Sequence, residues 1–302
     1  MNFNLFINVI LHFMRRIKMV SGALIVLFAL NACDKDSIDT QQTPQTTIGE
    51  TVEVSEAPKL VVTEEVTDVF KSNYFNVGEI KIVDFHLPDG TVEQRYGIED
   101  DIAISREQYE HIASLDRSVG QYHTNNLVNP RTLTIIGYTG SPFALSSKER
   151  TALQWAVNNY NRLNLSIRLD LTFGTNFGDK DMVVYNNTVN NPGVSGGVAG
   201  FPSGGNPNKF IQIYGLSGFS TNVNEHVITH EIGHSIGFRH TDWFSRQSCG
   251  ENINEGVAPF GANPIPGTPT GFDPTSLMLA CFNSGVDGEF NNNDVIALNF
   301  LY

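Results

Sequence analysis

The side chains best suited to chemistry lie within eleven residues of this 302-residue chain, in the run HEIGHSIGFRH from His230 to His240. On a helix, His230 and His234 would project from neighbouring turns of one face, where both imidazoles can bind one ion. Gly237 has no Cβ and can adopt the left-handed conformation that ends a helix, which would bring His240 back to the same ion. Three imidazoles leave a fourth position open, as in catalytic zinc sites, so we predict one catalytic Zn²⁺ held by these histidines.

Glu231 follows the first histidine and is the predicted catalytic residue. Its carboxylate would point toward a metal-activated water and accept a proton from it as a general base. His226 lies one helical turn upstream on the same face, but the three-histidine set is complete without it. We therefore interpret His226 as a solvated side chain, or as one that supports a ligand without binding the ion.

The histidine motif is expected to lie on a helix, because only helical geometry brings residues four apart onto one face. Asn222 has the side chain of an N-cap, and Glu225 follows at the third position as in a capping box. Apolar residues recur at helical spacing along the segment, namely Val223, Val227, Ile228, Ile232 and Ile236.

Upstream segments predict the rest of a layered domain. A helix capped by Ser146 or Ser147 runs to Leu163, and four segments have the pattern of strands: 132–138, 167–173, 182–185 and 210–214. This order predicts a mixed sheet backed by two helices. The glycine-rich run 194–201 is either an edge strand that pairs with an extended peptide or a flexible surface loop.

The zinc-binding run carries a family resemblance. Residues 230–243 are similar to the extended zinc motif of the metzincin metallopeptidases, and the HEIGH wording resembles the dual-action HEIGH metallopeptidase family. Met278 resembles the methionine that metzincins place beneath the zinc ligands, in the Met-turn. Ala280 stands where some metzincins have a zinc-binding tyrosine, so no such ligand is expected.

The resemblance covers residues 131–302. It implies an α+β fold, with a metzincin-like mixed five-stranded sheet, an active-site helix and a backing helix. It also implies a zinc-dependent endopeptidase that acts on protein or peptide substrates. A non-catalytic zinc-containing surface lipoprotein that binds peptide or glycan is the alternative, and the same chemistry could serve a hydrolase of a non-peptide amide or a glycan cross-link.

The first 33 residues are typical of a bacterial lipoprotein signal peptide. A basic segment at 14–18 precedes the apolar run 20–30, which is too short for a transmembrane helix. Cys33 ends a run that resembles a lipobox, in which the cysteine is lipidated; the alternative is an ordinary signal peptide with a chance cysteine. Polar residues 34–59 are predicted as a flexible tether. We thus expect an exported lipoprotein anchored to the cell envelope, at the outer membrane or the cell surface.

Residues 60–130 are predicted as a small prodomain, followed by the zinc metallopeptidase domain at 131–302. The prodomain contains a strand-like segment at 79–85 and a helical one at 106–115. Within it, the run from Ile98 to Asp101 is predicted as an acidic turn before a strand. The alternative comes from a faint similarity to the aspartate-bearing prosegment motif of astacin-like metzincins, whose glycine is missing here; it implies that Asp101 blocks the zinc.

The chain has three cysteines. If Cys33 carries lipid, Cys249 and Cys281 remain and can form a disulfide in an oxidising compartment. A zinc–thiolate site is the alternative, but it would need two more thiols or imidazoles close by.

Charge excludes one class of partner. Lys and Arg total 19 against 32 Asp and Glu, and phosphate contacts need clustered cations, so we expect no nucleic-acid binding. We expect a monomer. The acidic run 287–294 does not have the spacing of an EF-hand loop and instead predicts a helix cap at Asn292 or Asn293.

Overall fold

The computed structural model describes residues 59–72, 80–98, 101–114, 123–255, 262–269 and 271–302. The predicted signal peptide, Cys33 and nearly all of the predicted tether lie outside the described residues. None of the helices within the described ranges has the length and hydropathy of a transmembrane span.

Five strands form the larger sheet, in the order β5-β4-β6-β8-β7. Their bounds are Thr132–Tyr138 (β4), Arg168–Gly174 (β5), Met182–Asn186 (β6), Gly196–Val198 (β7) and Phe210–Tyr214 (β8). Four of the strands are parallel, and the edge strand β7 pairs antiparallel with β8. The prediction of an α+β fold with a mixed five-stranded sheet is therefore confirmed, and the glycine-rich run contains an edge strand.

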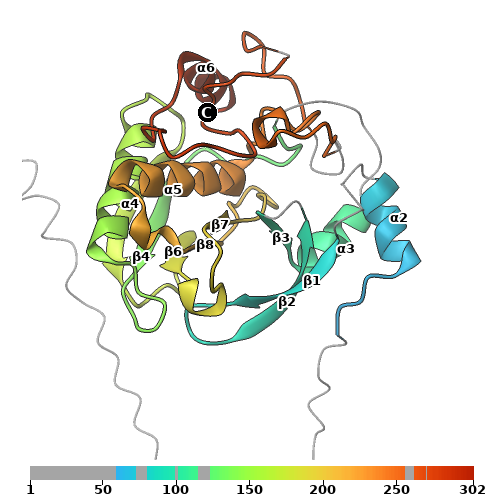
Figure 1. The fold of residues 1–302 in the computed structure, drawn as a ribbon, viewed down its shortest axis with the longest axis horizontal. Coiled ribbons are helices and arrows are strands. Elements are labelled where there is room, and N and C mark those ends of the chain that lie inside the picture. The colour runs from blue at the N-terminus through green and yellow to red at the C-terminus, as the bar shows by residue number, and fades with distance from the viewer. Residues whose placement is uncertain (1–58, 73–79, 99–100, 115–122, 256–261, 270) are drawn as a thin grey trace, which may run out of the picture. The chain divides into compact units, whose positions relative to one another are not determined.

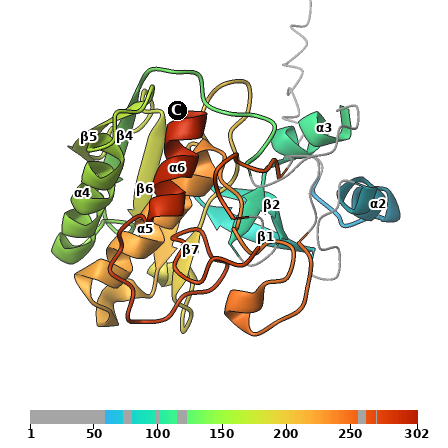
Figure 2. The same ribbon diagram turned by 90° about the horizontal axis from the view of Figure 1, so that it is seen from above.

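Two helices pack together on one face of this sheet, as Figures 1 and 2 show: α4 (Ser147–Asn161) and α5 (Thr221–Ile236). Side chains alternate along the strands, so one set points into the core beneath the helices. That core contains Leu133, Ile135, Met182, Val184, Ile211 and Ile213 from the strands, packed on both helices. The C-terminal helix α6 (Asn292–Leu301) adds Ala297 and Leu298 to the same core.

A smaller antiparallel sheet precedes this domain. It has the order β1-β2-β3, with bounds Lys81–His86, Val92–Ile98 and Ile102–Ile104, and it is accompanied by α2 (Glu64–Ser72) and α3 (Arg106–Ser114). Phe85, Leu87 and Ala103 from this region share a buried cluster with the opposite face of the larger sheet, represented by Ile136 and Tyr185. The small sheet therefore covers the face that the helices leave open.

The two sheets are also joined through backbone hydrogen bonds. Ala199, just after β7, donates from its amide to the carbonyl of Asp101 and accepts from the amide of Ala103, both at 3.0 Å. This parallel bridge brings the start of β3 beside the end of β7, which Figure 1 shows.

Helix capping agrees with the sequence at one of three sites. Ser146 caps α4, as predicted, and forms a capping box with Glu149. The cap of α5 is Ser220 and not Asn222, because the extended Ser220 accepts from the Val223 amide and the helix begins two residues earlier than expected. Likewise Asn291, and not Asn292 or Asn293, caps α6. Short 3-10 turns occupy Thr188–Asn190, Leu216–Gly218 and Gln247–Cys249.

Candidate metal centre

Gly237 ends helix α5 and turns the chain toward the site. Its φ of 118° lies in the left-handed region, and its amide donates to the carbonyls of Gly233 and His234. A Cβ at this position would also lie 2.9 Å from Thr124 Oγ1 and from Leu127 Cδ2. Both the conformation and the packing therefore require glycine here, as the sequence predicts.

The structure brings His230, His234 and His240 together. These residues are 6%, 0% and 1% exposed. One nitrogen from each lies within 4.8 Å of the others and of an Asp101 oxygen. The Nε2 atoms of His234 and His240 are 3.2 Å apart. Such a buried set of imidazole nitrogens is a donor set that suits zinc.

Each imidazole forms a hydrogen bond through its Nδ1 atom, on the side of the ring away from the point where the Nε2 atoms converge. The partners are the Leu277 carbonyl for His230 at 3.0 Å, the Phe238 carbonyl for His234 at 2.8 Å and Glu255 Oε1 for His240 at 2.8 Å. Because these partners are acceptors, each Nδ1 acts as the donor and each Nε2 is left to bind a cation. The donor set therefore fits a zinc ion.

Charge at the site also favours a cation. Burial opposes protonation of His240, but the carboxylates of Asp101 and Glu255 outweigh it and raise the pKa of this imidazole well above its usual range. Burial and the neighbouring His230 lower the pKa of His234 to about 4. The carboxylates that would stabilise a proton here would equally stabilise a bound metal ion.

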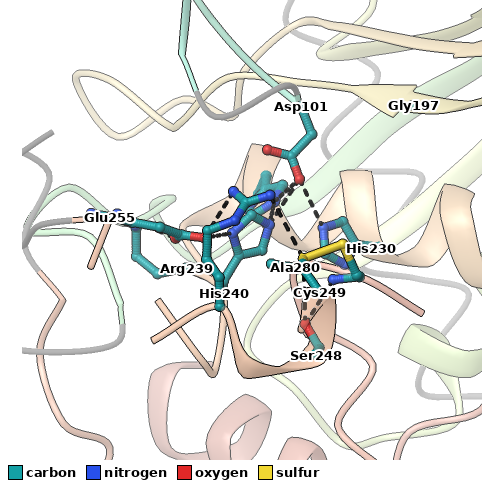
Figure 3. Close-up of polar contacts among 12 residues, drawn as sticks. Asp101, Gly197, His230, Arg239, His240, Ser248, Cys249, Glu255 and Ala280 are labelled. Carbon is teal, nitrogen blue, oxygen red and sulfur yellow. Dashed lines mark hydrogen bonds and ion pairs between the residues drawn. A yellow bond between two sulfur atoms is a disulfide. The ribbon is translucent and has the colours of Figure 1, made fainter. Parts of the chain in front are cut away.

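The carboxylate of Asp101 points toward the rings of His230 and His240, as Figure 3 shows. Its Oδ2 lies 2.8 Å from His240 Nε2, 3.7 Å from His230 Nε2 and 3.9 Å from His234 Nε2. Asp101 does precede a strand, as the prediction of an acidic turn requires, yet its carboxylate lies where the imidazoles converge. This geometry supports the blocking interpretation.

Glu231 lies at the same site, beneath the edge strand. It is 2% exposed, and a Cβ at Gly197 would lie 2.6 Å from its Cγ and Oε1 atoms. Within the described part of the chain its Oε2 has no hydrogen-bond partner. Burial, followed by the charge of Asp101, raises the pKa of Glu231 well above its usual range, which suits a group that must take up a proton.

Met278 lies under the helix, where the Met-turn is expected. A Cβ at Gly233 would be only 2.5 Å from its sulfur, so the glycine of HEIGH allows this close approach. The segment is held by Asp294, which accepts from Ser276 Oγ at 2.7 Å and from the Leu277 amide at 3.0 Å. Ala280 donates from its amide to Asp242 and provides no ligand atom, as expected.

The predicted disulfide is present. Cys249 and Cys281 are bonded to each other across a sequence separation of 32 residues. Since both sulfurs are used, the zinc–thiolate alternative is wrong. The bond ties the loop after His240 to the segment that follows Met278.

His226 is not a member of the converging set. Its ring lies 6.5 Å from that of His230 and 4.5 Å from that of Phe282, between centroids. It is 4% exposed, so the solvated interpretation is wrong. Burial, followed by His230, lowers its pKa to about 3, which keeps the ring neutral at ordinary pH.

A cavity of about 370 Å³ extends from His230 along the first turns of α5. Its apolar lining comprises Leu216, Phe219, Val223, Val227, Leu279 and Phe282. Asp101, Gly197 and Glu231 line the end at the candidate metal centre. The site therefore combines a metal donor set, a buried carboxylate and an apolar recess.

Sequence reasoning missed Glu255 as a partner of His240. It lies 15 residues downstream in a loop, and no spacing signal connects the two. Its complete burial is unusual for a glutamate, but this is visible only in the folded chain.

These features define a metallopeptidase of the type in which one broken helix supplies the metal ligands. The family model of the dual-action HEIGH metallo-peptidases matches residues 96–302, and the chain belongs to this family. The match begins before Asp101 and thus includes the segment that reaches the histidines.

Solved structures give weaker similarities. Two structures of myroilysin are 11% identical to the chain, with TM-scores of 0.36 and 0.34; they cover 57% and 54% of this chain and 83% and 77% of their own. A structure of a chaperone–substrate complex is 17% identical over 73% of this chain and 40% of its own, with a TM-score of 0.29. No curated protein matches the chain.

Proposed function

We propose that this metallopeptidase is a zinc-dependent endopeptidase. The observation that carries the proposal is the convergence of three buried imidazoles next to Glu231, in a chain of a metallopeptidase family. His230, His234 and His240 would hold one zinc ion. Bound there, zinc would supply Lewis acidity that polarises a peptide carbonyl and acidifies water.

Glu231 would act as the general base and acid. Its buried carboxylate would accept a proton from the attacking water and then deliver it to the leaving amine. Burial raises the pKa of this carboxyl group, which would help it to hold the proton between the two transfers. Gly197 would keep the carboxylate beneath the edge strand.

The edge strand and the cavity would bind the substrate. Extended peptides add to exposed strand edges through their backbones, which fits an endopeptidase better than a small-molecule hydrolase. The residues after β7 offer such an edge at Ala199, although Asp101 and Ala103 occupy it in this structure. The apolar cavity beside Glu231 would accept a large apolar side chain next to the scissile bond.

Residues 60–130 would keep the enzyme latent. Asp101 would take the fourth position that water needs, while the backbone of β3 uses the substrate edge. Loss of the Asp101 carboxylate would open the metal position, and displacement or cleavage of the segment would also free the substrate edge.

We also propose export and anchoring of the protein. Residues 1–33 would act as the signal peptide and Cys33 as the lipidated anchor at the cell envelope. The Cys249–Cys281 disulfide supports an oxidising compartment outside the cytoplasm. The catalytic domain would act as a monomer on protein substrates, without nucleic acid.

The test is chelator-sensitive cleavage of casein, together with zinc analysis of the same sample. It is measured with Asp101→Ala, so that no carboxylate blocks the metal position. In that background Glu231→Gln should retain stoichiometric zinc and lose several orders of magnitude in turnover, because the proton acceptor is gone. A Glu231→Gln protein that cleaves at the parent rate would refute the assignment. Stoichiometric zinc without cleavage of any peptide library would favour a binding lipoprotein or a hydrolase of another amide.

A further inference from the structure

Glu255 is the carboxylate that stands directly behind the candidate metal centre. Its side chain is fully buried, and its Oε1 accepts a hydrogen bond from His240 Nδ1 at 2.8 Å. Its amide donates to the Trp243 carbonyl at 2.7 Å, which fixes the backbone of the loop at this point. Figure 3 shows Glu255 and Asp101 on different sides of the His240 ring.

The three imidazoles differ in what holds them. Neutral backbone carbonyls accept from His230 and His234, whereas His240 alone is held by a carboxylate. A charged acceptor makes a stronger hydrogen bond and raises the basicity of the ring nitrogen on the other side. His240 also needs this support most, because it lies beyond the end of α5 and the helix does not position it.

A buried carboxylate must be compensated, and two arginines provide the compensation. Arg246 Nη1 lies 3.3 Å from Glu255 Oε1, and Arg239 Nη2 lies 3.8 Å from Oε2. The same Arg246 pairs with Glu251 at 3.0 Å. The charge on Glu255 is therefore part of a built network and not an isolated group at the surface.

We propose that Glu255 is a positioning residue that fixes His240 as the Nδ1–H tautomer and strengthens its Nε2 as a metal ligand. The inference rests on the proposed zinc centre and concerns the affinity of that centre. Glu255 touches neither substrate nor the metal position, so its effect passes through His240.

Zinc affinity measured by competition with a chromogenic chelator tests the proposal, using full-length protein. Glu255→Ala should raise the zinc Kd by about ten- to a hundredfold, as loss of such a partner does elsewhere. Glu255→Gln keeps a neutral acceptor in place and should raise Kd by about fivefold, since only the charge is lost. The visible spectrum of the Co²⁺ form should change in the alanine variant, because the His240 ring is no longer fixed.

Glu251→Gln is the matched control. It removes an ion pair from the same arginine in the same loop without touching His240, so its zinc Kd should stay within about twofold of wild type. Far-UV circular dichroism of the metal-free proteins checks folding. If Glu255→Ala does not fold, the zinc Kd of Glu255→Gln tests the proposal.

The outcomes separate this proposal from the proposed function. If the wild-type chain binds zinc and the folded Glu255 variants bind it with the same Kd, the role of Glu255 is refuted and the proposed function stands. An equal loss of affinity in Glu251→Gln would also overturn it, since the effect would then belong to the loop. A wild-type chain that binds no zinc would remove the proposed function and this inference together.

Discussion

Replacing Asp101 with alanine should activate the full-length chain. The substitution removes the carboxylate that faces the histidines and leaves the backbone pairing with Ala199 in place. A polar contact to a charged group contributes about 1.5–3 kcal/mol, and about 1.4 kcal/mol corresponds to a tenfold change in an equilibrium. The balance between blocked and open sites should therefore move by about ten- to a hundredfold toward the open form. The peptidase activity should rise by the same factor.

A quenched fluorogenic peptide, assayed with zinc-loaded protein of measured zinc content, gives the rate. Asp84→Ala is the control, because Asp84 is an exposed carboxylate in β1 of the same region. A folded, zinc-loaded Asp101→Ala chain no more active than wild type would refute the latency proposal, and equal activation by Asp84→Ala would show a non-specific effect of lost charge.

Substitution is a better test than truncation before residue 131. The region ahead of that residue covers one face of the larger sheet, including the buried Ile136, Val183 and Tyr185. A chain that lacks it would expose this apolar surface, which promotes aggregation. Loss of activity on truncation would then report misfolding and not the mechanism.

Two further predictions concern packing and pH. Gly197→Ala should push Glu231 aside and lower kcat by about a hundredfold with zinc retained. The control is Gly218→Ala, which should change kcat little because a Cβ there meets no atom within 4 Å. Equal rates for the two variants would show that the contact between Gly197 and Glu231 does not matter for turnover. Burial raises the pKa of Asp294 to about 6, so the stability it contributes is full below its unfolded pKa near 3.8 and is lost as pH rises through 6. Relative to Asp294→Asn, the wild-type free energy of unfolding should thus fall by about 2 kcal/mol between pH 4 and 7. A rise measured by urea titration would contradict this.

The sequence predicts the metal centre well where the chemistry is local. His230 and His234 are neighbours by helical geometry alone, and Gly237 is needed for a left-handed turn at a fixed place, so spacing is sufficient. The strand pattern likewise predicts the sheet, because short apolar runs rich in β-branched residues favour strands. Alternation alone does not show which residues are buried, since four consecutive residues of β6 are buried. The pairing of Cys249 with Cys281 follows once the third cysteine is set aside, and the structure contains it.

The remaining features depend on contacts between distant segments. Asp101 reaches His240 across 139 positions, and nothing in its neighbours distinguishes a blocking carboxylate from an acidic turn. The observed caps of α5 and α6 differ from the predicted ones because several cap-forming residues are consecutive in the sequence. Only the backbone conformation decides which of them begins the helix. The burial of His226 has the same origin, since Phe282 from the C-terminal region covers its ring.

The C-terminal helix contributes no atom to the metal centre, yet a relay of hydrogen bonds connects them. Asp294 in the first turn of α6 holds Leu277, and the carbonyl of Leu277 holds His230. Any change that shifts α6 would therefore be transmitted to a histidine that it never touches. Metal binding and the stability of α6 should therefore be coupled. Removal of the metal by a chelator should destabilise α6, and a substitution that destabilises α6 should lower the affinity for the metal.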